Sequence, residues 1–291
     1  MSTNAGAVPG YRAHNLHTMA YGAMMLGRSA DAMEAVERLE AALPEEVLRI
    51  SVPNMADWAE SYIALRPHVL IRFGRWEEIL ELDIPEDREL YSCTVATILY
   101  AKGIALAALG RTDDAASAQQ EFRIAKQKVP ASRLASLPVR HVQALEVADA
   151  MLNAELEYRL ENYATAWSEF RRAIALEDSL PYADPPALIQ PVRHAYGALL
   201  LEQGHVAEAA EVYRADLGLA PDVLPRRRAR VNNMWSLHGL YECLTRLDRV
   251  EEAKAIELQK AIAVANADIE VGSSCFCRLQ AVTACCAMPQ L

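Results

Sequence analysis

The sequence predicts an all-helical protein built from repeated helix pairs, and three observations lead to this fold class. Ala, Leu, Glu and Arg dominate the composition, and these residues favour helices over strands. Hydrophobic residues make up 52% of the 291 positions while glycine and proline stay near average, so a packed core is expected in one large domain or two ordinary ones. The third observation is a turn pattern that recurs along the chain.

The turn pattern is a glycine followed by Arg or His, with a small or aliphatic residue five positions after the glycine. A helical stretch precedes each copy, and another follows it. A small residue also stands seven positions before four of the turns, where it allows the two helices of a pair to approach each other. Clear copies of the turn begin at Gly27, Gly74, Gly110 and Gly204, weaker copies begin at Glu161 and Asp248, and the small residues are Ala20, Gly103, Ala154 and Gly197.

This pattern resembles the tetratricopeptide repeat, a 34-residue helix-turn-helix unit that stacks into a solenoid. The stretches 69–76, 185–193 and 235–240 are similar to a mostly uncharacterised group of bacterial and fungal tetratricopeptide proteins. The resemblance covers residues 13–265 and implies a concave groove, while it supplies no substrate. We therefore expect an N-terminal arm over 1–12, about six helix pairs and a C-terminal capping tail over 266–291, with the pairs around 13–44, 57–85, 94–126, 138–178, 187–221 and 232–265.

The spacing of the turns is irregular, so the linkers between pairs carry insertions. The longest linker covers residues 126–140, and a second, proline-rich linker covers 179–186. Pro67 falls late in the first helix of the second pair. We expect that helix to be kinked, or to begin anew at the proline.

Charge and targeting signals narrow the class of partner. The formal net charge of −10 repels phosphate, which disfavours nucleic acid and anionic membranes as partners. The basic run at 226–230 is interpreted as a solvated loop. No apolar stretch is long enough to span a bilayer and no secretory signal is evident, so we expect a cytoplasmic protein whose six cysteines are thiols.

The histidines fall on one predicted surface. When the turn residue is counted as position 15, the resemblance implies that positions 2, 5, 9 and 12 of each first helix line the groove. The helical period supports this, because these positions form one stripe. The histidines of the stripe are His14, His17, His68, His194 and His238. His141 lies 14 residues before Glu155, which holds a groove position, and joins them if its helix runs unbroken from Pro138.

Clustered imidazoles indicate a metal site, because neutral imidazole is the commonest protein ligand for copper, iron and zinc. His14 and His17 share one helical face, and His68 on the next first helix completes a three-histidine site with an open coordination position. His194 and His238 form a second site or meet the first. Copper is favoured over iron or zinc, since soft sulfur ligands are available if the tail folds back to bring Cys275 and Cys277 near.

The predicted function is a metal-dependent oxidase or oxygenase that acts on a small organic molecule in the groove. Glu155, Tyr100 and Tyr21 are its candidate catalytic groups, and its pocket is lined by Met24, Met151, Trp235 and Glu242. Three alternatives remain open: a metal-free pocket for anions or acid–base chemistry, separately hydrogen-bonded histidines, and a scaffold that binds a peptide or partner protein. Members of the family that bind peptide carboxylates use Lys and Arg in the groove. Apart from Arg72, the predicted groove positions hold almost no such cations, and this disfavours the scaffold.

Overall fold

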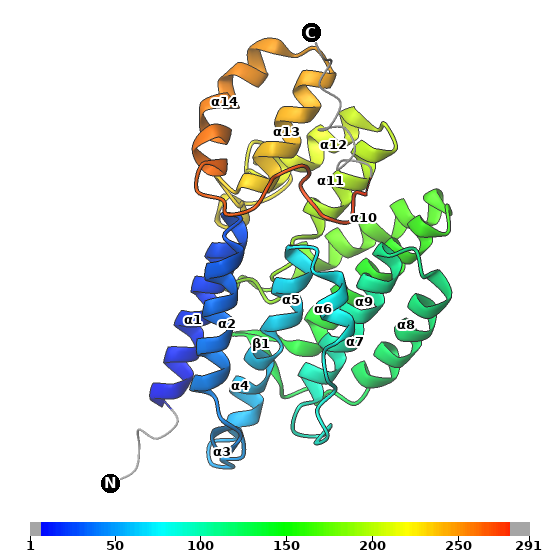
Figure 1. The fold of residues 1–291 in the computed structure, drawn as a ribbon. Helices are drawn as coiled ribbons and strands as arrows, with labels where there is room; N and C mark the ends of the chain where they lie inside the picture. Colours follow the sequence, from blue (N-terminus) through cyan, green and yellow to red (C-terminus); the bar gives the residue numbers. More distant parts are fainter. Residues whose placement is uncertain (1–6, 280–291) are drawn as a thin grey trace. The chain divides into compact units, whose positions relative to one another are not determined.

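The computed structural model describes residues 7–279, which are mostly helical and contain almost no sheet (Figure 1). This confirms the predicted all-helical class. The chain divides into two compact units. Unit 1 contains residues up to 22 together with 30–190, and unit 2 contains 23–29 together with the chain from 191 onward.

Unit 1 is a series of helix pairs with one small β-hairpin. Helix α7 packs against α8, and α9 packs against both α7 and α10. The second pair is split, because its first helix is broken into α4 and α5. The elements are α1 (Ala7–Met25), α2 (Ser29–Ala42), α3 (Glu45–Leu48), α4 (Met55–Ile63), α5 (Leu65–Arg72), α6 (Trp76–Leu80), α7 (Ser92–Ala108), α8 (Thr112–Lys126), β1 (Leu134–Ser136), β2 (Val139–Arg140), α9 (His141–Arg159) and α10 (Tyr163–Ser179).

Unit 2 contains two further pairs and the described part of the tail. Helices α11 (Val192–Glu202) and α12 (Val206–Asp216) form the first pair, and α13 (Met234–Arg246) and α14 (Val250–Val264) form the second. A short 3-10 helix, η1 (Arg226–Arg228), lies between the pairs. After α14, residues 265–279, which we call the tail segment, run back beside α13 (Figure 1). No helix among residues 7–279 is long and apolar enough to cross a membrane.

Each of the six predicted turns has the same backbone geometry. One residue adopts a positive φ between 56° and 79°, and its N–H bonds the carbonyl three residues back. The next N–H bonds the carbonyl five residues back, for example from Arg111 to Leu106 at 2.8 Å. This is the Schellman arrangement, which satisfies the last carbonyls of a helix and reverses the chain. The left-handed residues are Gly27, Gly74, Gly110, Glu161, Gly204 and Asp248.

Small residues permit close helix contacts, as predicted, although not always within one pair. A Cβ atom on Gly197 would lie 2.4 Å from the Tyr213 ring, between the paired helices α11 and α12. A Cβ atom on Gly103 would lie 2.8 Å from Leu152, which belongs to α9 of the next pair. Each glycine therefore makes room for one large buried side chain.

The structure differs from the sequence expectation in its N-terminal arm and in the 126–140 linker, whereas the expected break near Pro67 is present. Helix α1 begins at Ala7, so residues 7–12 of the predicted arm are helical. The broken helix of the second pair restarts at Leu65, and Pro67 lies in its first turn, where an N–H has no partner within the helix. The 126–140 linker contains the antiparallel β1–β2 hairpin, whose strands were not predicted.

A buried carboxylate from α4 caps helix α7. Glu60 is fully buried and accepts hydrogen bonds from the backbone N–H of Cys93 at 3.1 Å and of Thr94 at 2.9 Å. These are free donors at a helix N-terminus, where a negative charge is also favoured by the helix dipole. Burial nevertheless raises the pKa of Glu60.

The turn geometry predicts opposite effects for one substitution at two glycines of unit 1. Gly110→Ala should lower the free energy of unfolding by about 1–2 kcal/mol, because alanine is strained at a φ of +75°. Gly22→Ala should raise it by about 0.5–1 kcal/mol, because Gly22 lies within helix α1 with open space around its Cβ position. Urea unfolding of both variants gives the two values, and equal effects would contradict the role assigned to the turn.

Candidate functional site

Three buried histidines of unit 1 form what we call the imidazole row. His17 lies on α1, His68 on α5 and His141 at the start of α9. Their exposed fractions are 6%, 8% and 5%. Each belongs to the first helix of a pair, where the sequence placed the groove.

The rings of the row influence one another electrostatically. Burial, together with the nearby His68 and His14, lowers the pKa of His17 to about 3. Burial lowers the pKa of His68 to about 3, helped by His141. Burial and then Arg133 lower the pKa of His141 to about 4. The three rings are therefore neutral at physiological pH.

Four ring nitrogens of the row lack a hydrogen-bond partner within the described part of the chain. They are Nδ1 of His17, Nδ1 of His68 and both nitrogens of His141. Most buried polar atoms in proteins are paired, and an orphaned one points to water, an ion or a ligand. The orphaned atoms therefore make the row the candidate site of unit 1.

Aromatic side chains surround the row. The His17 ring lies 5.2 Å from the Tyr62 ring, and the His68 ring lies 6.3 Å from the Tyr100 ring. The Tyr100 hydroxyl is 3.9 Å from the Met151 sulfur, a weak acceptor. Burial and the nearby Glu155 raise the pKa of Tyr100, so its O–H keeps its proton. The surroundings therefore supply apolar ring surface and one hydroxyl donor.

Glu155, expected as a metal ligand or general base, is engaged in an ion pair. Arg159, one turn further along α9, donates to Glu155 Oε1 from Nε at 3.0 Å and from Nη2 at 2.7 Å. Both side chains are largely buried. This pairing places a compensating positive charge beside Glu155, and its role as ligand or base stays a prediction.

The remaining predicted residues of the first pair have different surroundings. His14 is half-buried and near enough to His17 to lower the pKa of that ring. Tyr21 is half-buried as well. Met24 is fully buried in unit 2, where its backbone carbonyl accepts a hydrogen bond from Trp235 Nε1 at 2.7 Å. Of the expected site of His14, His17 and His68, both His14 and His68 thus act electrostatically on His17.

His194, also expected as a metal ligand, belongs to a buried polar network in unit 2. Its Nε2 lies 2.9 Å from Asp216 Oδ2. Asp216 is fully buried and also accepts from Arg230 Nη1 at 2.8 Å and from Ser236 Oγ at 2.7 Å. Burial opposes the charge of Asp216, but His194 and Arg230 hold its pKa below the ordinary value. His194 thus joins α11 to α12, which explains its burial without a metal.

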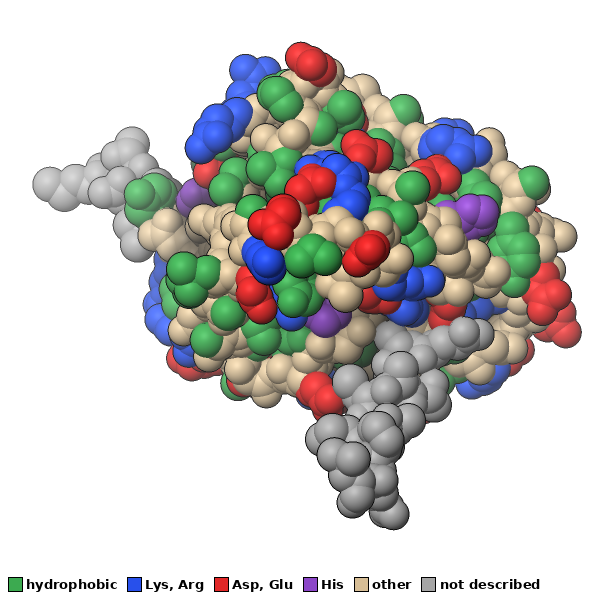
Figure 2. Space-filling model, turned by 90° about the horizontal axis from the view of Figure 1, so that it is seen from above, with side chains coloured by type: hydrophobic (Ala, Val, Ile, Leu, Met, Phe, Trp, Pro, Cys, Tyr) green, Lys and Arg blue, Asp and Glu red, His purple; other side chains and the backbone are tan. Residues whose placement is uncertain are grey.

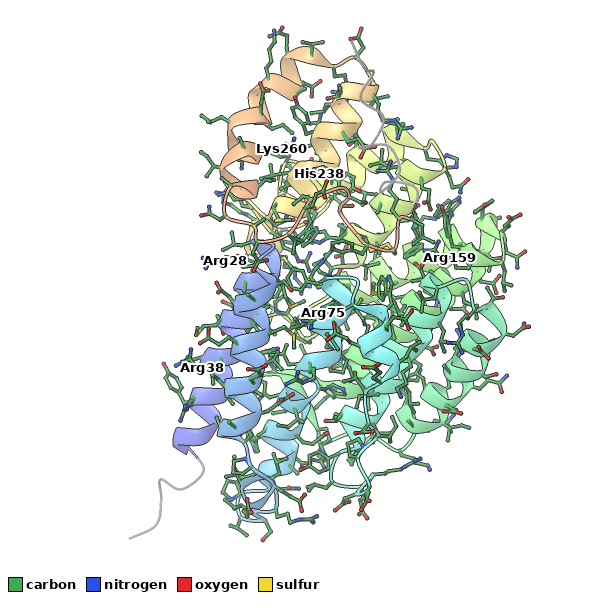
Figure 3. The ribbon with its side chains drawn as sticks, viewed as in Figure 1. Arg28, Arg38, Arg75, Arg159, His238 and Lys260 are labelled. Atoms are coloured by element: carbon green, nitrogen blue, oxygen red, sulfur yellow. A yellow bond between two sulfur atoms is a disulfide. The ribbon has the colours of Figure 1, made fainter. Side chains whose placement is uncertain are left out.

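His238, Trp235 and Glu242 lie against the tail segment. Burial lowers the pKa of His238, labelled in Figure 3, and the nearby backbone of Gly272 opposes this shift. The Trp235 ring meets the Phe276 ring edge to face at 6.1 Å. Glu242 accepts two hydrogen bonds from the Arg278 guanidinium, at 2.7 and 3.0 Å. The tail segment thus contacts α13 through Phe276 and Arg278, and its role as a cap of the repeats stays a prediction.

The cysteines of the tail segment take no part in a histidine cluster. Cys275 and Cys277 form a disulfide with each other. The expectation that these two cysteines are thiols is therefore wrong in this structure, and their role as soft ligands stays a prediction. Cys285 and Cys286 lie outside the described residues.

A metal centre is not evident in the described ranges. Within residues 7–279, no three side chains of His, Cys, Asp or Glu are grouped closely enough to hold one ion. The imidazole row is a set of neighbours rather than a coordination sphere. The copper, iron or zinc site remains a prediction from the sequence.

Comparisons with known protein families, with curated proteins and with solved structures found no match.

Several residues of these sites escaped the sequence analysis. Tyr62 lies on α4, before the break that separates α4 from α5, and it is not at one of the predicted groove positions. Asp216 ends a second helix, and Phe276 and Arg278 follow the last repeat, so no repeat position predicts them. Arg278 could have been singled out from the sequence, because it is the single basic residue of the predicted tail over 266–291 and follows Cys277 directly.

The imidazole row predicts that acid destabilises unit 1. The unfolded chain binds a proton on each histidine below about pH 6.5, whereas the folded rings stay neutral down to about pH 3 to 4. Stability is therefore present above the unfolded pKa and is lost as the pH falls, by up to about 1.4 kcal/mol per pH unit for each ring.

The free energy of unfolding should depend less steeply on pH in the variant His17→Gln than in the wild type. It should depend still less steeply in the double variant His17→Gln/His68→Gln. The free energy of unfolding measured in urea between about pH 7 and pH 5 tests this. Glu60 titrates with the opposite sign because its pKa is raised, but it is common to all three proteins and cancels. Parallel pH profiles for the three proteins would contradict the prediction.

Proposed function

We propose that this chain is a solenoid of the tetratricopeptide type and that the imidazole row of unit 1 binds a small, uncharged organic molecule. The six equivalent turns and the paired helices support the solenoid. The orphaned ring nitrogens of His17, His68 and His141 carry the binding proposal, because a buried polar atom without a partner costs about 1–3 kcal/mol. A ligand that bonds them recovers this free energy.

The chemistry of the row indicates an uncharged ligand. Each neutral imidazole offers one N–H donor and one lone pair, so the row suits hydroxyl, carbonyl or amide groups. Charged ligands are disfavoured, because the neutral rings provide no counter-charge and an unpaired buried charge is costly. The rings of Tyr62 and Tyr100 supply apolar contact area.

The row is better suited to binding than to proton transfer. A general base works best with a pKa near the operating pH, and the pKa values of these histidines lie well below it. Tyr100, with its raised pKa, likewise stays a donor. A metal ion needs several ligands around one point, whereas an organic molecule can bridge rings that lie further apart. A cytoplasmic location and a small-molecule ligand, without nucleic acid or membrane partners, complete the proposal.

Carbethoxylation by diethyl pyrocarbonate tests the proposal, because this reagent is itself a small uncharged carbonyl compound that reacts with neutral imidazole. In the native protein, His17 and His68 should react at most about 100-fold more slowly than the exposed His205 of unit 2. Peptide mass spectrometry gives the rate at each histidine.

A sealed core gives a different result. If the reagent enters only through global unfolding, the reaction slows by about 1,000-fold or more and accelerates in dilute urea. That result would overturn the binding proposal. Elemental analysis beside the variant His14→Ala/His17→Ala is the companion measurement, since near-stoichiometric copper, iron or zinc that disappears in the variant would favour the metal-dependent enzyme instead.

A further inference from the structure

The tail segment contacts three side chains that form one stripe on α13. Trp235, His238 and Glu242 are three and four residues apart, so they share a helical face. Phe276 contacts the first, Arg278 pairs with the third, and the backbone of Gly272 is near the second. The stripe thus contacts an aromatic ring and a guanidinium of the tail segment.

A fourth contact fixes the tail segment against α11 and α12. Ser274 is fully buried, and its hydroxyl donates to the His194 carbonyl at 3.0 Å. The Ser274 oxygen also lies 2.5 Å from the Tyr213 hydroxyl. Since the single Ser274 proton is used on the carbonyl, Tyr213 is the donor in this second bond. The subsite accepts a small hydroxyl side chain, and its Tyr213 ring is positioned by Gly197 and Gly239.

We propose that the stripe and the Ser274 subsite form a peptide-recognition groove that the chain blocks with its own tail. The ligand of this groove is a segment of a partner protein that carries the same pattern as Ser274, Phe276 and Arg278 of the tail. The pattern is a hydroxyl residue, an aromatic residue two positions later and an arginine two positions after that. This inference rests on unit 2 and is independent of the site proposed for unit 1.

Charge supports a basic partner. Glu242 binds the Arg278 guanidinium through both carboxylate oxygens, a geometry that lysine cannot reproduce. Glu202 adds a second negative charge near Arg278. The chain carries a net charge of −10, and acidic and basic side chains intermingle over the face in Figure 2. An arginine-bearing segment is therefore attracted both locally and by the protein as a whole.

The form of the tail segment suits a displaceable plug. Within the described residues after Val264, the tail forms neither helix nor strand, and its hydrogen bonds to His194 and Glu242 come from the side chains of Ser274 and Arg278. Arg278 N–H bonds the Cys275 carbonyl at 3.2 Å, which closes a turn around Phe276. Segments held in this way open at a lower free energy than the helices they cover.

Peptide binding to the full chain tests the inference. The probe is a fluorescein-labelled peptide of residues 268–279 with both cysteines changed to serine, measured by fluorescence anisotropy. The variant Phe276→Ala/Arg278→Ala, whose own tail is weakened, should bind the probe at least tenfold more tightly than the wild type. A probe carrying Arg278→Glu should lose this affinity and regain it on a protein that also carries Glu242→Arg.

Two results would overturn the inference. One is a folded variant, with an unchanged circular dichroism spectrum, that does not bind the probe. The other is binding that ignores the charge reversal. If the variant does not fold, hydrogen exchange of the wild type decides: tail amides that exchange faster than those of α13 support a plug, and equal rates show a permanent part of the fold.

Discussion

The fold depends on one backbone constraint, the left-handed residue that ends the first helix of each pair. A second helix can return along the first only if the chain reverses within a few residues while the last carbonyls find donors. Glycine meets this condition without strain at four turns, whereas Glu161 and Asp248 hold the same conformation with a side chain. The strain at these two positions is balanced by the packing of the helices that they join. Positions along every first helix are then fixed relative to its turn, including those that bring His17 and His68 together.

Much of this arrangement follows from residues that can be read in the sequence. Gly27 and Gly110 mark the reversals, and counting back from them places the histidines on one face of the first helices. The prediction from repeat position fails where a side chain bonds a residue that lies outside the repeat pattern. His194 lies at a groove position, yet its ring turns to Asp216, which is at the end of another helix. The partners of Glu242 and Trp235 follow the last repeat, so no period could predict them.

The two sets of buried histidines show how the environment decides the role of the same side chain. In unit 2, the Asp216 carboxylate is hydrogen-bonded to His194, Arg230 and Ser236, which come from three different segments of the chain. Such a network fixes one arrangement of the helices, and it does so at the cost of burying charge. In unit 1, the rings of His68 and His141 are buried without a comparable acceptor. Stability alone would favour apolar side chains at these positions, so their presence points to a role outside folding.

Unit 2 is built from two segments that lie far apart in the sequence, and this affects the order in which it can form during synthesis. Its residues come from 23–29 and from the chain beyond 190, and Asp268 accepts the Ser29 N–H at 2.7 Å. Ribosomes add about 5–20 residues per second, so the early segment leaves the ribosome on the order of ten seconds or more before its partner exists. During that interval the end of α1 has no native neighbour from unit 2. Nascent chains stopped short of Asp268 would therefore lack a complete unit 2 and would be targets for chaperones.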